Sequence, residues 1–384
     1  MQTQAPAHTS VTIQEVTTKK QLRQFVDFPN RLYKDMPQFV PAFYGDDLAD
    51  WDKKKNPAFQ YSEARCWLAL RENKIVGRIG AILSHASNEK WETKRMRFTQ
   101  VDFIDDHEVS AALFATVEAW AAERGCNQVH GPLGFCDMDR EGMLVDGFDK
   151  RSMFITYYNH PYYNDHLAAL GYQKDTDWIE YKVDAPSPDS PHAVKLHRIA
   201  EHVKKSRGLH IVQVKTRFHY KPYVKQVFDL ANEAYAPLYG TVPLNEQQVK
   251  KYADKFIPLL DPRFTCFVLD KDERLVAFGV SAPSMAAAMQ KCRGRMFPFG
   301  WIYMLKALAK NNALDMFLIA VRPELQGVGI NAIILDHLIQ NAAANGIQYA
   351  ETGPQLETNS KILAQWKMFA KDQHKRRRCY IKEL

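Results

Sequence analysis

The chain has 384 residues, of which 46% are hydrophobic and 25% are charged, and its formal net charge is +7. This composition is typical of a globular protein and excludes an intrinsically disordered chain. The length favours two domains, each large enough to bury its own core. The basic excess suits a phosphorylated cofactor, an anionic membrane surface or nucleic acid, and total charge does not choose among these partners.

Cysteine and histidine are spaced without any pattern that would predict a disulfide framework or a metal site. The six cysteines stand singly, with no CxxC pair, and the 13 histidines form no HExxH motif. Residues 1–10 are polar, and no stretch of about 18 apolar residues occurs. We therefore expect a cytoplasmic protein with reduced thiols and no metal, for which attachment to the inner face of a membrane stays open.

The first predicted domain covers residues 9–184 and alternates strands with helices. Apolar periodicity predicts a strand, a hairpin, a strand, an amphipathic helix and a closing strand at residues 11–16, 66–79, 96–104, 108–124 and 178–183. Three prolines among small polar residues then predict a stiff connector at 185–191.

The second predicted domain, residues 192–384, repeats this order about 200 residues later. Its strand, hairpin, strand, amphipathic helix, further strand and closing strand are expected at residues 210–214, 266–278, 314–321, 330–344, 347–352 and 379–382. A repeat of this length indicates duplicated domains rather than a solenoid. The predicted class is therefore α/β (α+β), with two tandem domains that each have a mixed twisted sheet and helices on both faces.

The most informative segment lies where the strand at 314–321 meets the helix that begins at Ile330. A loop with Gly327 and Gly329 joins the two, so unpaired backbone N–H groups and the positive end of the helix dipole converge there. Glycine leaves the backbone open and adopts the left-handed conformations that aim N–H groups at an anion. The order of strand, proline, glycines and helix predicts a pyrophosphate site, and a tight turn with strained glycines is the alternative.

This segment resembles the acyl-CoA loop of the GNAT superfamily of N-acyltransferases, in which Q/R-x-x-G-x-G/A follows the end of a V-x-P strand. The matching residues are Val321, Pro323, Gln326 and Gly329, whereas Asn331 stands where Gly or Ala is usual. The resemblance extends to an asparagine that hydrogen-bonds the cofactor in the family. It implies that the second domain binds acyl-CoA or acetyl-CoA as co-substrate, with contacts from Ala320, Val321, Gln326, Gly327, Val328, Gly329, Ile330, Asn331 and Asn359.

The same resemblance implies how the thioester is held and attacked. The strands ending near Val321 and Thr352 would splay apart, and a backbone N–H near Ala320 or Val321 would polarise the thioester carbonyl. The amine acceptor must lose a proton before it attacks, so a base or a desolvating pocket is required. The nearest carboxylates are Glu351 and Glu357, followed by Asp315, and a structural or solvated role is the alternative for each.

Trp366 occupies the position at which GNAT enzymes have a tyrosine that can protonate the departing thiolate. An indole N–H cannot deliver a proton in this pH range, so that role is absent or filled elsewhere. Two hypotheses follow from this departure. The first is N-acyl transfer by direct attack of the amine, and the second is a catalytically silent protein that binds acyl-CoA or a regulatory ligand.

The first domain has no equivalent phosphate loop. Residues 101–108 contain no glycine and present four carboxylates, Asp102, Asp105, Asp106 and Glu108, which would repel a pyrophosphate. We therefore expect a degenerate GNAT-like domain that shapes the acceptor site. Its aromatic stretch at 131–163 either lines an acceptor pocket, where Asp146 or Asp149 would hold a cationic amine, or is buried against the second domain.

Two further segments bear on the partners. Residues 291–306 interleave large apolar residues with Lys and Arg, which is typical of a membrane-interface helix, of a lid over an apolar acceptor, or of a core helix. The basic run at 375–378 suits nucleic acid, anionic lipid or an edge strand.

Over nearly its whole length the chain resembles bacterial tandem GNAT-like proteins, some of which are associated with ceramide synthesis. The expected partners are therefore a small-molecule or lipid amine and a peripheral membrane surface. Nucleic acid binding rests on charge alone, and no oligomeric state is predicted.

Overall fold

A computed structural model describes residues 10–367, 369 and 373–384. Two compact units divide the chain. Unit 1 comprises Met1–Asp149, Thr156–Asp177 and Arg377–Leu384, and unit 2 comprises Lys150–Ile155 and Trp178–Arg376. No helix among the described residues is long and apolar enough to cross a bilayer.

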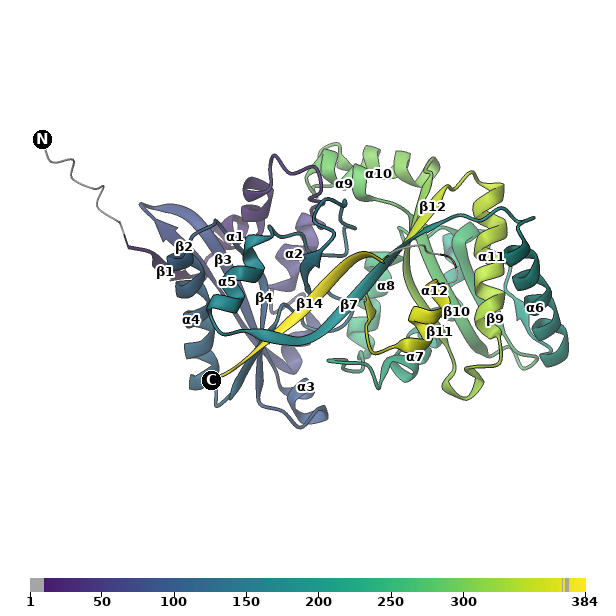
Figure 1. Cartoon of the computed structure of the whole chain (residues 1–384), viewed down its shortest axis with the longest axis horizontal. Coiled ribbons are helices and arrows are strands. Elements are labelled where there is room, and N and C mark those ends of the chain that lie inside the picture. The colour runs from purple at the N-terminus through teal and green to yellow at the C-terminus, as the bar shows by residue number, and fades with distance from the viewer. Residues whose placement is uncertain (1–9, 368, 370–372) are drawn as a thin grey trace, which may run out of the picture. The chain divides into compact units, whose positions relative to one another are not determined.

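Unit 1 is built on a mixed sheet with the strand order β1-β2-β3-β4-β5-β14 (Figure 1). Among these described strands only β4 and β5 pair in parallel, and the other neighbours are antiparallel. The elements are β1 (Thr12–Glu15), α1 (Lys19–Leu32), α2 (Tyr44–Asp50), β2 (Ser62–Arg71), β3 (Lys74–Ser84), α3 (His85–Lys90), β4 (Arg95–Phe103), α4 (His107–Glu123), β5 (Gln128–Gly131), β6 (Met143–Asp146), α5 (Tyr162–Ala169), β7 (Gln173–Asp184) and β14 (Gln373–Glu383).

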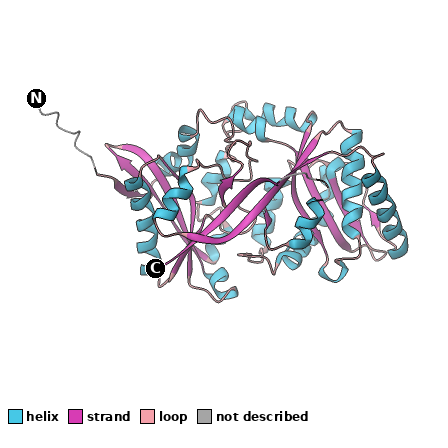
Figure 2. Cartoon of the chain, in the orientation of Figure 1, coloured by secondary structure: helices cyan, strands magenta, loops and turns pink. Residues whose placement is uncertain are grey.

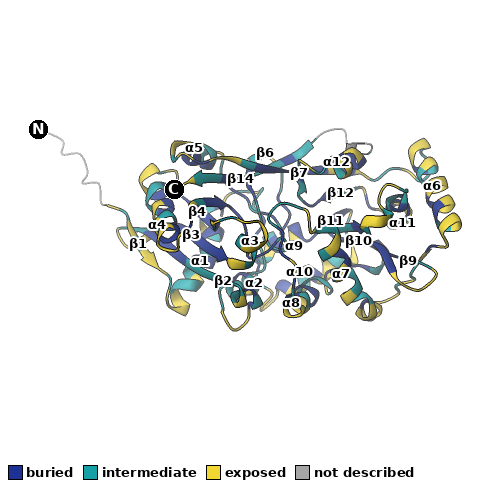
Figure 3. Cartoon of the chain, turned by 90° about the horizontal axis from the view of Figure 1, so that it is seen from below, coloured by how far each residue is buried: buried dark blue, intermediate teal, exposed yellow. Residues whose placement is uncertain are grey.

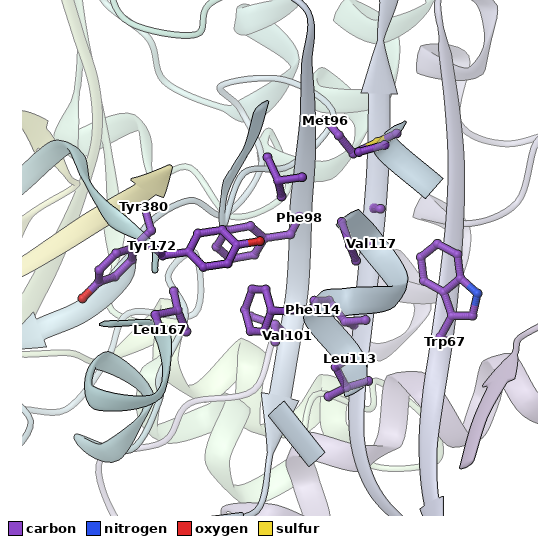
Figure 4. Close-up of a cluster of buried hydrophobic side chains, with 14 of the residues drawn as sticks. Trp67, Met96, Phe98, Val101, Leu113, Phe114, Val117, Leu167, Tyr172 and Tyr380 are labelled. Atoms are coloured by element: carbon purple, nitrogen blue, oxygen red, sulfur yellow. The ribbon is translucent and has the colours of Figure 1, made fainter. Parts of the chain in front are cut away.

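Helices pack on both faces of this sheet because apolar residues occupy both sides of its central strands. Trp67 points into the cluster that contains α4, and the next residue, Leu68, points into the cluster that contains α1. On α4, Leu113 and Val117 lie four residues apart and face the sheet. Tyr380 of β14 joins the same core, as Figure 4 shows.

Unit 2 repeats the arrangement, with the strand order β8-β9-β10-β11-β12-β7. Figure 2 shows the strands of the chain in magenta and the helices in cyan. Here β11 and β12 are the parallel pair. The elements are α6 (Pro191–Arg207), β8 (His210–Ile211), α7 (Val224–Tyr235), α8 (Glu246–Phe256), β9 (Thr265–Leu269), β10 (Leu275–Pro283), α9 (Ala286–Cys292), α10 (Gly300–Ala309), β11 (Ala313–Val321), α11 (Ile330–Ala344), β12 (Tyr349–Thr352), β13 (Gln355–Leu356) and α12 (Ser360–Lys367).

The two faces of this second sheet are also covered by helices. Buried residues of α11 and α6 form one apolar cluster with the sheet, and α7 contributes to another. On α6, Ala200 and Val203 are buried while most other positions are exposed, the yellow residues of Figure 3. The predicted class, two mixed sheets with helices on both faces, is confirmed.

The last strand of each half contributes to the sheet of the other half. Val183 and Asp184 at the end of β7 pair with β12 of unit 2, whereas Tyr380 and Ile381 of β14 pair with β5 of unit 1. The unit limits therefore fall inside β7 and β14, and they differ from the predicted limits of 9–184 and 192–384 with a connector at 185–191. Both closing strands have similar apolar patterns, so the sequence pattern fits either sheet.

Candidate functional site

The loop between β11 and α11 in unit 2 has the conformation that its glycines were predicted to permit. Gly327 and Gly329 have φ angles of +81° and +88°, in the left-handed region. A Cβ on Gly329 would lie 3.3 Å from Cγ2 of Val203, so that position is both strained and crowded for any other residue.

No side chain of the described residues caps the N-terminus of α11. Gly329 is the N-cap residue and has no side chain to cap the first helical turn, although its carbonyl accepts a hydrogen bond from the N–H of Ala332 at 3.0 Å. Asn331 does not cap the helix either, because its Nδ2 donates to Oε1 of Gln365 on α12 at 2.7 Å. The N–H groups of Ile330 and Asn331 have no hydrogen-bond acceptor among the described residues, and together with the helix dipole they favour an anion at this position.

Beside this loop, β11 extends beyond its parallel partner. Pairing between β11 and β12 ends at Met316 and Thr352, and β11 continues to Val321 with β10 as its only strand neighbour among the described residues. The two strands therefore separate where the resemblance implied that they would splay.

Alternation along β11 determines which backbone groups face this opening. The N–H of Arg322 donates to the carbonyl of Val276 on β10 at 2.9 Å. In an antiparallel pair, alternate residues bond to the same neighbour, so the backbone of Ala320 is also directed at β10. Ile319 and Val321 face the opening instead, which favours Val321 over Ala320 for the contact to a thioester carbonyl.

The two carbonyls at the opening already accept hydrogen bonds. The Tyr235 hydroxyl donates to the carbonyl of Ile319 at 2.9 Å, and Nε2 of Gln326 donates to that of Val321 at 3.3 Å. The N–H groups of Ile319 and Val321 are the donors that remain at this edge. No sequence motif marks Tyr235, because it lies on α7, far from β11 along the chain.

The equivalent opening in unit 1 is filled by that unit's own side chains. The N–H of Ile104 donates to the carbonyl of Val76 at 3.0 Å, which corresponds to the bond between Arg322 and Val276. Phe103 therefore corresponds to Val321. Its N–H donates to the Tyr163 hydroxyl at 2.8 Å, and its carbonyl accepts from the Tyr162 hydroxyl at 2.7 Å.

The helix N-terminus in unit 1 is also occupied. The Asp106 carboxylate accepts from the N–H groups of Glu108 and Val109 at 2.9 and 3.3 Å and so caps α4. The Arg71 guanidinium, 2.5 Å away, and these N–H bonds lower the pKa of Asp106. A carboxylate thus holds the place that an anion would take, whereas α11 in unit 2 has no such group in the described part of the chain.

The aromatic stretch at 131–163 contributes to the packing of unit 1. Tyr158 and Tyr163 are buried in apolar clusters of that unit. Asp146 and Asp149, the predicted partners of a cationic amine, are exposed. These tyrosines are therefore buried within unit 1 itself, and both the acceptor pocket and burial against the second domain stay predictions.

Two of the three predicted carboxylates lie side by side at the start of the strand opening. Asp315 of β11 and Glu351 of β12 are register neighbours. Buried Lys375 on β14 places its Nζ 3.0 Å from Oε2 of Glu351 and 3.2 Å from Oε2 of Glu180, and also donates to the carbonyl of Arg151. No sequence motif linked Lys375 to this cluster, because its partners come from distant segments.

The two neighbouring carboxyl groups titrate at different pH values. Burial and the adjacent Glu351 carboxylate raise the pKa of Asp315 to about 7. Burial opposes ionisation of Glu351 as well, but His374 and Lys375 outweigh it and lower its pKa to about 2. Asp315 therefore exchanges its proton near neutral pH, whereas Glu351 stays ionised in an ion pair. These environments favour Asp315 over Glu351 for the role of base.

Glu357, Asn359 and Trp366 each have a role in the packing or hydrogen bonding of unit 2. Glu357 pairs with Arg376, with 3.2 Å between Oε2 and Nη1. Asn359 caps α12, because its Oδ1 accepts from the N–H of Ile362 at 3.4 Å. Trp366 is buried against Leu363 and other apolar residues, and its Nε1 has no hydrogen-bond partner among the described residues.

An apolar pocket borders the strand opening on the α11 side of the sheet. Met316, where β11 and β12 stop pairing, lines it together with Leu335 and Ile339 of α11 and Trp366 of α12. Its lining can accommodate hydrocarbon and offers almost no polar group.

Comparison with known proteins gives the same architecture. The chain superposes on a tandem GNAT protein from the clavulanic acid biosynthesis pathway with a TM-score of 0.56 at 12% identity, covering 97% of this chain and 98% of that one. A GCN5-related N-acetyltransferase from Sphaerobacter thermophilus gives a TM-score of 0.53 at 10% identity, covering 97% and 95%. The chain therefore has the tandem GNAT fold.

Two curated proteins are related to the chain in sequence, and their names differ. The chain is 26% identical over 372 residues to protein YghO of Escherichia coli K12, covering 95% of this chain and 94% of that protein. It is also 26% identical over 294 residues to the bacterial ceramide synthase of Caulobacter vibrioides, covering 76% and 74%. No protein-family model matches the chain.

Proposed function

We propose that the protein is an N-acyltransferase in which unit 2 binds acyl-CoA. The observation that carries this proposal is the difference between the two units at equivalent positions. In unit 2 no described side chain caps the helix N-terminus and Val321 faces an open strand edge, whereas unit 1 fills both places with Asp106, Tyr162 and Tyr163. Unit 2 thus keeps room for a pyrophosphate and for an arm lying along the strand.

Within this proposal, Asp315 takes the proton that the amine must lose. The neutral amine nitrogen then forms a bond to the thioester carbonyl carbon, the carbon–sulfur bond breaks, and the extra proton on the nitrogen passes to the departing sulfur, so that the products are an amide and a free thiol. One N–H group at this strand edge, that of Ile319 or that of Val321, stabilises the oxyanion that develops on the carbonyl oxygen; the two lie about 6.6 Å apart along the strand, so one oxygen accepts from only one of them. A thiol with a pKa of about 8.5 leaves at neutral pH without strong acid assistance, so Trp366 in place of tyrosine is compatible with turnover.

We further propose a long-chain amine of the sphingoid type as acceptor. One relative is named a bacterial ceramide synthase. The apolar pocket beside Met316 supports the same substrate class, because it offers hydrocarbon contacts and almost no hydrogen-bonding group.

A silent protein that only binds acyl-CoA is the second candidate, and one observation favours it. Trp366 is 3% exposed and packs in the core, so no side chain from that position reaches a leaving thiolate. Calorimetry with acetyl-CoA and palmitoyl-CoA, followed by amide formation with a panel of amines, separates the candidates. Binding without turnover supports the silent protein, and the absence of heat with both ligands contradicts both candidates.

Gly329→Asp should abolish or strongly weaken CoA binding. The new carboxylate would cap α11 as Asp106 caps α4, and it would repel the pyrophosphate. Losing charge-assisted hydrogen bonds to a phosphate costs about 1.5–3 kcal/mol, so calorimetry should show a roughly 10- to 100-fold higher Kd.

Gly346→Asp is the matched control for this substitution. Gly346 also has a positive φ, +69°, and follows the opposite end of α11. Gly346→Asp brings the same charge and also places a side chain at a positive φ, but it does not block the loop. The Kd of this variant for CoA should therefore match that of the unchanged chain. Equal Kd values for both variants would place the cofactor elsewhere.

A further inference from the structure

Large apolar side chains are exposed along one short segment of unit 2. Ten large hydrophobic residues of the described chain are at least 36% exposed, and six of them lie within residues 296–305. The most exposed of these six are Phe297 at 81% and Phe299 at 66%. The six residues are Met296, Phe297, Phe299, Trp301, Tyr303 and Leu305, and we name them the α10 patch.

The backbone around the α10 patch is ordered by its own hydrogen bonds. The N–H of Trp301 donates to the carbonyl of Met296 at 2.9 Å, and its Nε1 donates to the carbonyl of Pro298 at 3.0 Å. A Cβ on Gly300 would lie 1.9 Å from the carbonyl oxygen of Arg295, so glycine permits this close return of the chain. The aromatic side chains are thus presented by a defined turn.

Helix α10 has a buried face as well as the exposed one. Gly300 and Met304 lie four residues apart and are both buried. Trp301 and Leu305 lie on the neighbouring face, at 44% and 55% exposure. The helix therefore already packs through one face, and the α10 patch is additional apolar surface.

The charges along the segment that carries the α10 patch are all of one sign. No Asp or Glu occurs in residues 275–314. The same stretch contains five basic residues, of which all but Arg295 are exposed: Lys291, Arg293, Arg295, Lys306 and Lys310. Lys291 places its Nζ 5.9 Å from the ring centroid of Tyr303, so the charges and the aromatic rings are interleaved.

We propose that the α10 patch and these basic residues bind the surface of an anionic lipid bilayer. Aromatic rings and leucine enter the boundary between headgroups and acyl chains, while Lys and Arg attract anionic headgroups. An acidic protein surface would complement the charges but would leave Phe297 and Phe299 in water unless it offered apolar pockets of its own. This inference goes beyond the acyl-transfer function and does not rest on it.

Floatation of the full chain with vesicles tests the proposal. Vesicles of phosphatidylglycerol and phosphatidylcholine in equal parts should carry the protein upward, and pure phosphatidylcholine vesicles should carry much less. Phe297→Ser with Phe299→Ser should lower the partition constant roughly tenfold for each phenylalanine. Lys306→Gln with Lys310→Gln should lower it roughly fivefold for each charge.

Phe218→Ser provides the matched control, because Phe218 is 92% exposed but lies outside the α10 patch. It should bind vesicles like the unchanged chain, and all variants should keep their Tm because the substituted side chains are exposed. Failure to float with anionic vesicles would overturn the proposal, as would equal losses for Phe218→Ser and the Phe297/Phe299 double variant. A homodimer that the double variant dissociates without lipid would also overturn it, since a second copy would then cover the patch.

Discussion

Replacing Asp315 with asparagine should lower kcat/KM by about 10²–10⁴-fold, the range that general base assistance contributes. Asparagine is a close isostere of aspartate but cannot accept the proton of the ammonium acceptor. In the unchanged enzyme kcat/KM should rise with pH through about 7, because the pKa of Asp315 is raised to about 7 by burial and by Glu351. The variant should lose this rise, which steady-state kinetics from pH 5 to 9 would record.

Glu357→Gln is the control for this substitution. The sequence ranks Glu357 ahead of Asp315 as the candidate base, but Glu357 pairs with Arg376 and is partly exposed. Its substitution should leave both kcat/KM and the pH profile nearly unchanged. A larger loss in Glu357→Gln than in Asp315→Asn would show that the base has been assigned to the wrong carboxylate.

Asp315→Asn should also stabilise the protein while it inactivates it. In the folded protein the pKa of Asp315 is about 7, and in the unfolded chain it is near 3.8. The contribution of Asp315 to the free energy of unfolding is therefore highest below pH 3.8, and this contribution is lost as the pH rises through about 7. At pH 8 the unchanged chain therefore holds a buried carboxylate that the asparagine variant lacks. The variant should gain on the order of 4 kcal/mol at pH 8 and nothing below pH 3.8, a trend that urea unfolding at both pH values would reveal. A gain that does not depend on pH would contradict the raised pKa.

Lys375→Met should strongly destabilise unit 2. It would remove the cation beside Glu180 and one of the two basic groups, with His374, that hold the Glu351 carboxylate, and removing one partner of a buried ion pair costs about 3–5 kcal/mol. Urea unfolding of the full chain measures this loss directly.

Arg376→Met is the neighbouring control, because Arg376 pairs with Glu357 and is 29% exposed. Its loss should cost less than about 1 kcal/mol. Adding Glu351→Gln and Glu180→Gln to Lys375→Met should recover much of the stability, since no buried charge would then lack a partner. Equal losses for the Lys375 and Arg376 variants would show that the buried pairs contribute little.

The phosphate loop and the tandem repeat could be predicted because both are local patterns. Gly327 and Gly329 stand between an apolar strand and an amphipathic helix, and their left-handed conformations follow from residue type and order. The repeated hairpins likewise depend on alternation within about ten residues.

The parts that depend on contacts between distant segments could not be predicted. Tyr235 reaches the opening from α7, and Lys375 reaches Glu351 and Glu180 from β14. The choice of Val321 over Ala320 depends on the strand register, which the sequence does not specify. The three candidate bases, Glu351, Glu357 and Asp315, can be told apart only once the burial and the ion pairs of each carboxylate are known.

Unit 1 also has one feature that could be predicted from the sequence and one that could not. Its acidic residues predicted that a phosphate would be repelled, and Asp106 indeed occupies the helix N-terminus. The sequence did not reveal that Tyr162 and Tyr163 would occupy the strand opening beside Phe103. The aromatic stretch thus replaces a ligand at this position.

Hydrogen exchange of the whole chain with and without acetyl-CoA tests the central claim most directly. The cofactor should protect amides across residues 319–332, where Ile319, Val321 and the first turn of α11 donate to it. The equivalent residues 101–112 of unit 1 serve as an internal control and should exchange at unchanged rates. Protection of residues 101–112 without protection of 319–332 would contradict the account, as would unchanged exchange in both segments at saturating acetyl-CoA.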